Sequence, residues 1–358
     1  MTVARRFALA LLCLLCGMQS PAAPPVYPEI TPSYTLQFPR DFGAHPEYRT
    51  EWWYVTGWLT TEDGKALGFQ VTFFRSRPNI DEANASRFAP RQLIFAHAAI
   101  ADPATGRLLH DQRAARAGFG LAGADVGDTR VQLDDWHLTR AADGYTTLVR
   151  SREFTLALTL APTQPALPQG DAGYSRKGAL PAQASRYYSQ PQLHVTGTVS
   201  RHGKAQSVHG TAWLDHEWSS EYLSKNAVGW DWTGINLDDG GALMLFRIRD
   251  RDGNKLWAGG TLRRADGSTT TYPPEAITIT PLRRWRSART GAEYPVAIQL
   301  TAANLTITLE PLLDDQELDS RASTGAVYWE GAVTAKRDGK TIGRGYLELT
   351  GYFKPLRM

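Results

Sequence analysis

The sequence predicts an all-β protein built from two similar units. Segments in which apolar and polar residues alternate recur along the chain, and no long stretch keeps the spacing of an amphipathic helix. Eleven Trp, fourteen Tyr, twelve Phe and 32 Gly give a composition typical of strands joined by tight turns. The two halves of the chain also match each other, which indicates a duplication. Because exposed sheet edges are unfavourable, each unit is expected to form a closed or sandwiched sheet.

Residues 1–23 have the order of a Sec-type signal peptide: two arginines, an apolar run too short to span a bilayer, and small residues for cleavage. We therefore expect the mature chain to begin near Ala23 or Pro24 and to be periplasmic or secreted. Both cysteines, Cys13 and Cys16, fall in this leader, so the mature chain would have no thiol, disulfide or cysteine metal ligand. Acylation of Cys16 is the weaker alternative, because a leucine precedes it.

The mature chain is expected to be nearly neutral. The whole sequence has 39 Lys and Arg against 36 Asp and Glu, and two of the arginines lie in the leader. A nucleic-acid-binding surface needs concentrated positive charge. We therefore predict no nucleic-acid partner.

The first strands are predicted as a hairpin, with residues 51–60 and 67–75 as strands and 62–65 as the turn. A polar segment at 162–185 is long enough for a lid or for a simple connection. The one helix expected is short and covers residues 221–225. Further strands are predicted at residues 93–101, 135–140, 146–150 and 153–160.

The internal repeat has two parts. Aligning Trp53 with Trp230 also matches the Thr-Gly pairs that follow, so that Gly57 aligns with Gly234. A second match aligns the strand that ends the first half with the strand that ends the second, placing an aspartate at 215 against a glutamate at 348. The predicted domains are residues 24–222 and 223–358.

The stretch from 211 to 232 contains the densest chemistry, with four tryptophans beside several acids. As a strand, its side chains alternate between two faces. One face carries Trp213, Asp215 and Glu217, and the other carries Leu214, His216 and Trp218. The first face is suited to the wall of a ligand pocket, where a desolvated carboxyl keeps its proton near neutral pH. The alternative is a solvated acidic edge beside tryptophans that fill a core.

Several familiar chemistries are excluded by spacing. His216-Glu217 is followed by Ser220 where a zinc protease helix needs its second histidine. Ser175 and Ser189 lack the glycines of a hydrolase nucleophile elbow. The eight histidines do not cluster as metal ligands, so we predict no metal and no cofactor. His97, in the apolar strand FAHAAI, is interpreted first as a hydrogen-bonded core residue.

Seven aromatic-rich strings occur in order over residues 45–354: EWWYVTGWL, FAHAAI, RYYS, WLDHEW, GWDW, YWEG and GYLELTGY. In these strings the chain resembles the AttH-like family of secreted lipocalin-like proteins, which is related to the carotenoid 1,2-hydratases. The resemblance implies two lipocalin-like (calycin) β-barrel domains, in agreement with the repeat.

The resemblance also implies a candidate chemistry. Hydratases of this group add water to a terminal isoprenoid double bond without a cofactor, and their candidate proton donor corresponds to Asp215. Protonation creates a tertiary cation, which the faces of aromatic side chains stabilise. Where those hydratases carry a His-x-Trp pair, this chain has Arg186-Tyr187-Tyr188.

From the sequence we predict a periplasmic protein that binds a long apolar ligand, a lipid or isoprenoid, near the junction of its domains. The first alternative is a cofactor-free hydro-lyase with Asp215 as acid, and Glu217 and His216 as further catalytic candidates. The second is an accessory component of an export or ABC transport system, with transporter components as partners. The candidate ligand-binding residues are Trp53, His97, Tyr187, Tyr188, Trp213, Trp218, Trp230, Trp232 and Trp329.

Overall fold

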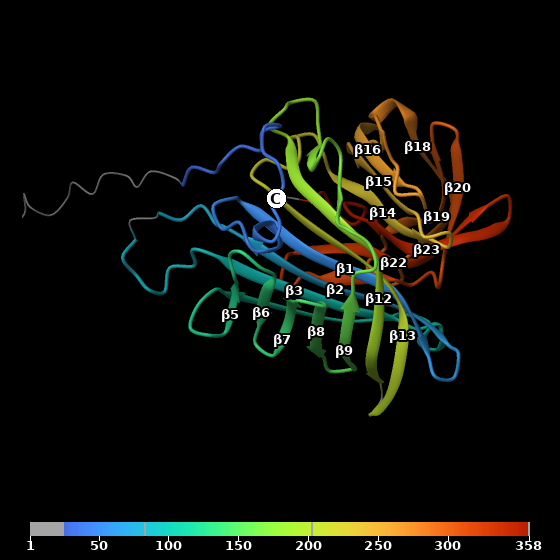
Figure 1. The fold of residues 1–358 in the computed structure, drawn as a ribbon, viewed down its shortest axis with the longest axis horizontal. Coiled ribbons are helices and arrows are strands. Elements are labelled where there is room, and N and C mark those ends of the chain that lie inside the picture. The colour runs from blue at the N-terminus through green and yellow to red at the C-terminus, as the bar shows by residue number, and fades with distance from the viewer. Residues whose placement is uncertain (1–24, 82–83, 202, 357–358) are drawn as a thin grey trace, which may run out of the picture.

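The computed structural model describes residues 25–81, 84–201 and 203–356, and these are almost entirely β-strand (Figure 1). The all-β prediction is confirmed. The helices within these residues are three single 3-10 turns, η1 (Arg40–Phe42), η2 (Pro103–Thr105) and η3 (Pro274–Ala276). No helix in the described part of the chain has the length and apolar character needed to cross a bilayer. The predicted signal peptide and its cleavage site lie outside the described residues.

The first sheet contains every strand from β1 to β13, all antiparallel to their neighbours. Its strand order is β4-β3-β2-β1-β13-β12-β9-β8-β7-β6-β5, with β10 and β11 also pairing with β12. Arg113 of β4 donates hydrogen bonds to the Leu133 carbonyl at 3.5 Å and to Asp135 at 2.5 Å. The edge strand β4 therefore contacts the β6–β7 turn near the other edge of the sheet, and the sheet forms a nearly closed barrel. The strands are β1 (Thr50–Thr61), β2 (Ala66–Ser76), β3 (Leu93–Ala101), β4 (Leu108–Arg116), β5 (Ala122–Ala124), β6 (Arg130–Leu133), β7 (Trp136–Ala141), β8 (Gly144–Arg150), β9 (Phe154–Ala161), β10 (Leu167–Pro168), β11 (Tyr174–Arg176), β12 (Ala184–Arg201) and β13 (Lys204–Ser219).

The second sheet contains ten antiparallel strands in the order β17-β16-β15-β14-β23-β22-β20-β19-β18, with β21 pairing with β22. In Figure 1 its strands run from yellow to red and lie above and to the right of the first sheet. The strands are β14 (Gly229–Leu237), β15 (Ala242–Arg249), β16 (Lys255–Arg263), β17 (Thr269–Tyr272), β18 (Ile277–Arg286), β19 (Glu293–Ala302), β20 (Leu305–Pro311), β21 (Glu317–Ser320), β22 (Ala326–Arg337) and β23 (Lys340–Leu349).

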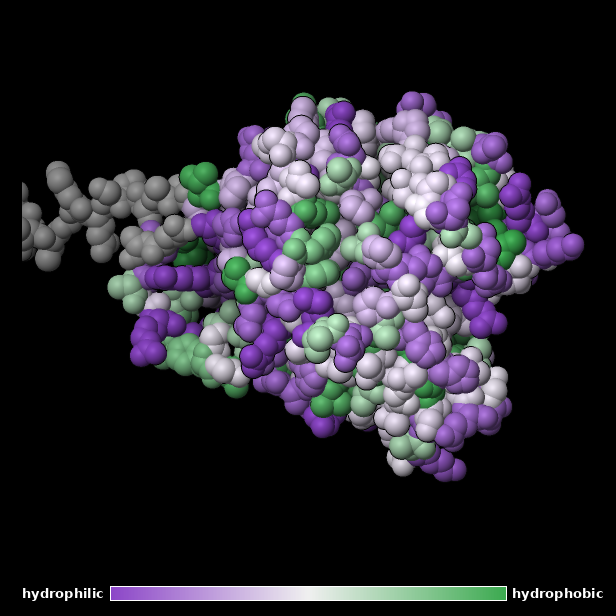
Figure 2. All heavy atoms as spheres, viewed as in Figure 1, coloured by the Kyte–Doolittle hydropathy of each residue, from purple (hydrophilic) through white to green (hydrophobic). Residues whose placement is uncertain are grey.

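Each sheet packs a hydrophobic core on its inner face, and the two outer faces pack against each other. The inner core of the first sheet includes Trp53, Val55 and Trp218, and that of the second includes Trp329. A third cluster lies between the sheets and contains residues of both, among them Tyr54. On the surface, hydrophobic residues occur in small groups among hydrophilic ones over the face shown in Figure 2.

The predicted hairpin is confirmed as β1 and β2, whereas the predicted helix at 221–225 is wrong. The ring of Tyr222 packs edge-on against Trp52 at 5.1 Å and against Trp230 at 5.7 Å, measured between centroids. These contacts between the sheets override a weak local helix preference. The segment at 162–185 contributes β10 and β11 to the first sheet, so it is a connection that pairs with β12.

The two matches of the predicted repeat differ in whether their aligned residues lie on corresponding faces of the sheets. Trp53 points into the core of the first sheet, whereas its aligned partner Trp230 lines a cavity between the sheets. Successive side chains of a strand point to opposite faces of the sheet, so the alignment of Trp53 with Trp230 is shifted by an odd number of residues and is wrong. Asp215 and Glu348, in contrast, lie on the last strands of their sheets and line the same cavity.

Candidate functional site

The candidate site is a small chamber between the outer faces of the two sheets. Strands β1 and β13 pair in register with Tyr54 opposite Asp215, and strands β14 and β23 pair with Trp232 opposite Glu348. The chamber has a volume of about 80 Å³, room for several water molecules or for the end of a hydrocarbon chain. Its walls are formed by Trp52, Tyr54, Phe74, Asp215, Glu217, Tyr222, Trp230, Trp232, Tyr328 and Glu348.

Asp215 is buried and surrounded by hydrogen-bond donors. The indole of Trp213 and the hydroxyl of Ser189 donate to Oδ1 at 2.6 and 2.5 Å, and the hydroxyl of Tyr187 donates to Oδ2 at 2.8 Å. The indole of Trp232 donates in turn to the Tyr187 hydroxyl at 3.0 Å. Burial raises the pKa of Asp215 to about 7, although the three donors favour the charged form. The carboxyl is therefore partly protonated at neutral pH.

Glu217, two residues further along the same face, is paired with a buried lysine. The Nζ atom of Lys177 lies 2.7 Å from Oε1 of Glu217, and Ser185 donates to the same oxygen. Burial lowers the pKa of Lys177 and raises the pKa of Glu217, while their mutual attraction opposes both changes. The ring of Phe246 lies 4.3 Å from Nζ and stabilises the cation. Glu217 therefore has a basic partner, whereas the three partners of Asp215 are neutral donors.

The second sheet contributes two further carboxyls. The indole of Trp230 donates to Oε2 of Glu348 at 2.8 Å, and burial raises the pKa of Glu348 to about 7, with the charges of Asp215 and Glu217 adding to the effect. Glu330 lies opposite Glu348 in the β22–β23 register. Tyr54 donates to its Oε1, its buried Oε2 has no partner among the described residues, and burial raises its pKa well above the usual range. Burial therefore favours the neutral form of the Glu330 carboxyl.

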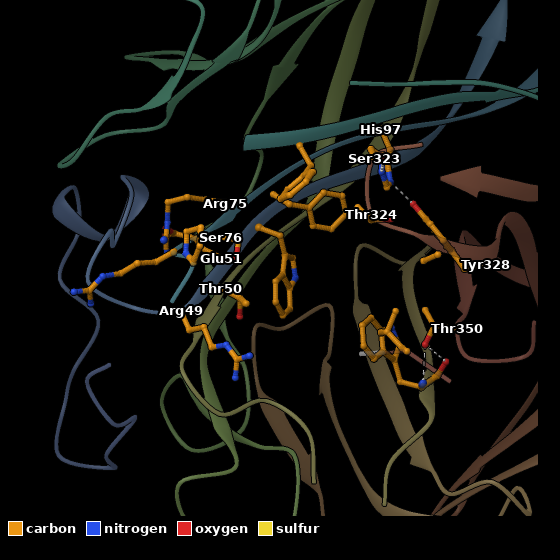
Figure 3. A pocket seen from close by; sticks show the side chains of 18 of the residues that line it. Arg49, Thr50, Glu51, Arg75, Ser76, His97, Ser323, Thr324, Tyr328 and Thr350 are labelled. Carbon is orange, nitrogen blue, oxygen red and sulfur yellow. Dashed lines mark hydrogen bonds and ion pairs between the residues drawn. The ribbon is translucent and has the colours of Figure 1, made fainter. Parts of the chain in front are cut away.

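A larger cavity of about 590 Å³ adjoins the chamber and shares Trp52, Phe74, Trp230, Tyr328 and Glu348 with it. His97 of β3 lies in its wall, with Nδ1 2.8 Å from the Tyr328 hydroxyl and Nε2 2.9 Å from Oγ of Ser323 (Figure 3). Burial lowers the pKa of His97 to about 3, with the charge of His110 adding to the effect, so the imidazole is neutral at pH 7. His97 therefore fixes the Tyr328 hydroxyl where the cavity and the chamber meet.

One group of side chains on the inner face of the first sheet has the composition of a metal site. Ligand atoms of His45, Glu51 and His216 lie within 4.8 Å of one another. However, Oε1 of Glu51 already accepts from His45 Nδ1 at 2.8 Å and from His216 Nε2 at 2.9 Å, and Arg75 bonds Oε2 at 2.7 Å. Burial alone would raise the pKa of Glu51, but Arg75 and His45 hold it well below its usual range. These residues form a charge-paired network in which the arginine disfavours a bound cation.

The predicted site residues divide according to the face of the strand on which they lie. Asp215, Glu217, Trp230 and Trp232 line the chamber, His97 lines the larger cavity, and Tyr187 and Trp213 donate to Asp215. The other five do not line the chamber: Trp53, Tyr188 and Trp218 lie in the core of the first sheet, His216 contacts Glu51, and Trp329 lies in the core of the second sheet.

Sequence reasoning missed residues of the chamber wall and residues that contact them. Glu348 was singled out only as the repeat counterpart of Asp215, and Glu330, Tyr54 and Lys177 were not identified. The aromatic-acid strings YWEG and GYLEL, which resemble WLDHEW, were the available signal for the two glutamates. Nothing local to Lys177 predicts its contact with a strand some forty residues away.

Comparison with known proteins agrees with these motifs. A family model described as AttH-like matches residues 29–352. A crystal structure described as AttH from Nitrosomonas europaea is 56% identical, with a TM-score of 0.86, over 91% of this chain and 99% of that one. No curated protein matches the sequence significantly.

Two more distant structures share the fold. Kievitone hydratase from Nectria haematococca is 15% identical, with a TM-score of 0.69, over 92% of this chain and 99% of that one. CghA with Sch210972 is 14% identical, with a TM-score of 0.54, over 93% of this chain and 98% of that one. On the match over residues 29–352 and the identity to the Nitrosomonas protein, the chain belongs to the AttH-like family.

Proposed function

We propose that this protein binds a long apolar ligand, a lipid or isoprenoid, in the cavity between its two sheets. The observation that carries the proposal is the position of the larger cavity directly beside an aromatic chamber, with Trp52, Phe74 and Trp230 in the walls of both. Burial of apolar surface against such walls is the main source of affinity for a ligand of this class. The hydrophobic cores fill the inner faces, which supports a ligand site between the sheets.

The binding proposal is tested with all-trans-retinol, whose binding is followed by quenching of tryptophan emission. Ala326 lines the larger cavity, so Ala326→Trp should fill part of it and weaken retinol binding at least tenfold. Ala141→Trp, at an exposed position on the other sheet, is the matched control and should bind retinol normally. Retinol binding that is equally strong in both variants would place the ligand elsewhere.

A second function, cofactor-free hydration of an isoprenoid alkene, is favoured by the two carboxyls whose pKa lies near 7. Asp215, protonated, donates its proton to the less substituted carbon of the terminal double bond and leaves a tertiary cation on the other carbon, beside Trp230 and Trp232. Glu348, ionised, accepts a proton from the water that adds to this cation. Transfer of one proton from Glu348 to Asp215 through solvent restores both groups. The name of the kievitone hydratase is in keeping with this chemistry, although that likeness concerns the fold alone.

Hydration is tested by incubating the protein with squalene in water enriched in heavy oxygen and analysing the products by mass spectrometry. Asp215→Asn and Glu348→Gln should each abolish label incorporation while retinol binding persists. Glu317→Gln, which alters a buried carboxylate outside the chamber, is the control and should retain activity per folded molecule. Label incorporation that survives Asp215→Asn would remove Asp215 as the acid.

We also infer that the two sheets descend from one duplicated lipocalin-like unit in an exported protein. In support, the first strand pairs with the last strand in each sheet: β1 with β13, and β14 with β23. Superposing β1, β2 and β13 on β14, β15 and β23 should bring Asp215 onto Glu348. A superposition that displaces them by a whole strand would argue against duplication.

A further inference from the structure

The larger cavity is lined by aromatic rings and also by a group of uncharged hydrogen-bonding side chains. This group consists of His97 from β3, Ser323 from the turn between β21 and β22, and Tyr328 from β22. Figure 3 shows His97 and Ser323 together, with a dashed line from His97 to Tyr328. The group therefore forms where the two sheets meet, and the direction of its hydrogen bonds decides which ligand atom it favours.

The direction of these hydrogen bonds is fixed at one end by Gln112 of β4, which pairs in register with His97. The Nε2 atom of Gln112 donates to the carbonyl of Asp319 at 2.6 Å, so its Oε1 atom faces Ser323. An amide oxygen only accepts, and it lies 2.7 Å from Oγ of Ser323, so the hydroxyl hydrogen lies between these two oxygens. The carbonyl of Ser320, at 3.2 Å, is a more distant acceptor. Ser323 has thereby used its one donor.

The other hydrogen positions follow from that of Ser323. Oγ of Ser323 accepts from Nε2 of His97 at 2.9 Å. The imidazole is neutral and carries one N–H, because burial lowers its pKa to about 3, so its Nδ1 accepts from the Tyr328 hydroxyl at 2.8 Å. Gln70 also hydrogen-bonds the Tyr328 hydroxyl. The N–H of His97 and the O–H groups of Ser323 and Tyr328 are thus all used within the protein.

This chain of hydrogen bonds leaves an open acceptor in the cavity wall. A serine oxygen accepts two hydrogen bonds, and among the described residues Oγ of Ser323 receives one, from His97. Ser323 is only partly buried and lines the cavity. A ligand O–H group therefore finds an acceptor at Ser323, whereas a ligand oxygen without a hydrogen finds no donor in this group of three side chains.

We infer that the larger cavity selects an apolar alcohol, whose hydroxyl donates to Oγ of Ser323 while its hydrocarbon part lies against Trp52, Phe74 and Trp230. This inference rests on the proposed binding function and names the chemical class of the ligand. A hydrocarbon gains only from the apolar walls. An ether brings an oxygen that faces the lone pair of Ser323 without a hydrogen between them, which is unfavourable. The alcohol satisfies both parts of the cavity wall.

The test is a thermodynamic cycle between the hydroxyl of Ser323 and that of the ligand. Three ligands are compared by quenching of tryptophan emission in the full-length protein: all-trans-retinol, its methyl ether, and the hydrocarbon in which CH2 replaces the ether oxygen. Ser323→Ala removes the acceptor and uncovers the Nε2–H of His97, a donor that favours the ether oxygen. The ratio of retinol to ether affinity should therefore fall at least fivefold, the change typical of one neutral hydrogen bond.

Two further variants separate the hydroxyl of Ser323 from the shape of its turn. Ser323→Thr keeps a hydroxyl and should keep the wild-type ratio of retinol to ether affinity. Ser268→Ala, at an exposed turn outside the cavity, is the matched control and should also keep it. Comparing ratios within one protein cancels any change that a variant makes to the affinity of all three ligands alike.

A ratio of retinol to ether affinity that is the same in wild type and Ser323→Ala would overturn the inference and leave the binding proposal intact. A ratio that falls equally in Ser323→Thr would also overturn it, because the turn and not the hydroxyl would then set the preference. The same holds if ether and hydrocarbon gain equally in Ser323→Ala, since the variant would then only have made space. Failure of all three ligands to bind would overturn the binding proposal and, with it, the assignment of the ligand class.

Discussion

Replacing Asp215 by asparagine is expected to remove a defined part of the pH dependence of stability. Burial raises the pKa of Asp215 from 3.8 to about 7 in the folded state. Because the folded state then binds the proton more tightly than the unfolded state, the resulting stabilisation is complete below about pH 4 and is lost as pH rises through about 7. A shift of about three pKa units corresponds to about 4 kcal/mol, of which roughly 2.5 kcal/mol is lost between pH 5 and pH 8.

The asparagine side chain fits the same hydrogen bonds. Its Oδ1 can accept the hydrogen bonds that Trp213 and Ser189 donate to Asp215. Its Nδ2 can donate to the hydroxyl of Tyr187, which also accepts a hydrogen bond from Trp232. The variant should therefore fold, and its stability should differ from wild type by an amount that depends on pH. Relative to wild type, Asp215→Asn should gain roughly 2.5 kcal/mol between pH 5 and pH 8.

The assay is urea unfolding of both proteins at pH 5 and pH 8, followed by tryptophan emission. Asp143→Asn, on an exposed turn, should reproduce the wild-type difference between the two pH values. Glu348→Gln should remove a further part of that difference, because burial also raises the pKa of Glu348 to about 7. If wild type and Asp215→Asn lose the same stability between pH 5 and pH 8, Asp215 is ionised in the folded protein and the acid proposal fails.

Three other predictions concern the N-terminus, the charge-paired network around Glu51 and the contact between the two sheets. Intact mass of exported protein should place the mature terminus near Ala23, and a lipid-modified Cys16 would contradict cleavage by signal peptidase. Glu51→Gln should destabilise the fold by about 3–5 kcal/mol in urea unfolding, since it leaves buried cations unpaired. At Gly68 an added Cβ would lie 2.5 Å from the Cβ of an alanine in β22, so Gly68→Ala should cost about 1–3 kcal/mol. Gly123→Ala, with nothing within 4 Å of the added Cβ, is its control, and equal melting temperatures for the two variants would show that the contact between the sheets accommodates the added methyl group.

The sequence predicted which side chains share a face but not what each face contacts. Alternation along residues 213–218 correctly separated Asp215 and Glu217 from His216 and Trp218. A tryptophan in a core and one in a chamber wall look alike in sequence, so Trp218 was grouped with the ligand-binding residues. The assignment needs the position of the second sheet, which depends on contacts far apart in the chain.

Buried polar groups that meet across strands were beyond the reach of sequence patterns. Lys177 approaches Glu217 because the segment after β9 folds back along β12, and Tyr54 reaches Glu330 from the opposite sheet. The helix expected at 221–225 failed for a similar reason, since Tyr222 packs between aromatic rings of both sheets. Strand positions, in contrast, followed from local alternation, as the agreement of 93–101 with β3 shows.

Because the two sheets pack with their outer faces together, substitutions on the two faces of one strand have different effects. Along β1, Trp52 and Tyr54 line the chamber, while Trp53 and Val55 support the core of their own sheet. Substitutions at the first pair reshape the chamber with the barrel interior unaltered, whereas substitutions at the second pair alter folding. Under the binding function proposed above, ligand preference can therefore diverge among relatives while each sheet keeps its own core, and a library restricted to alternate positions of β1, β13, β14 and β23 would test for new specificities.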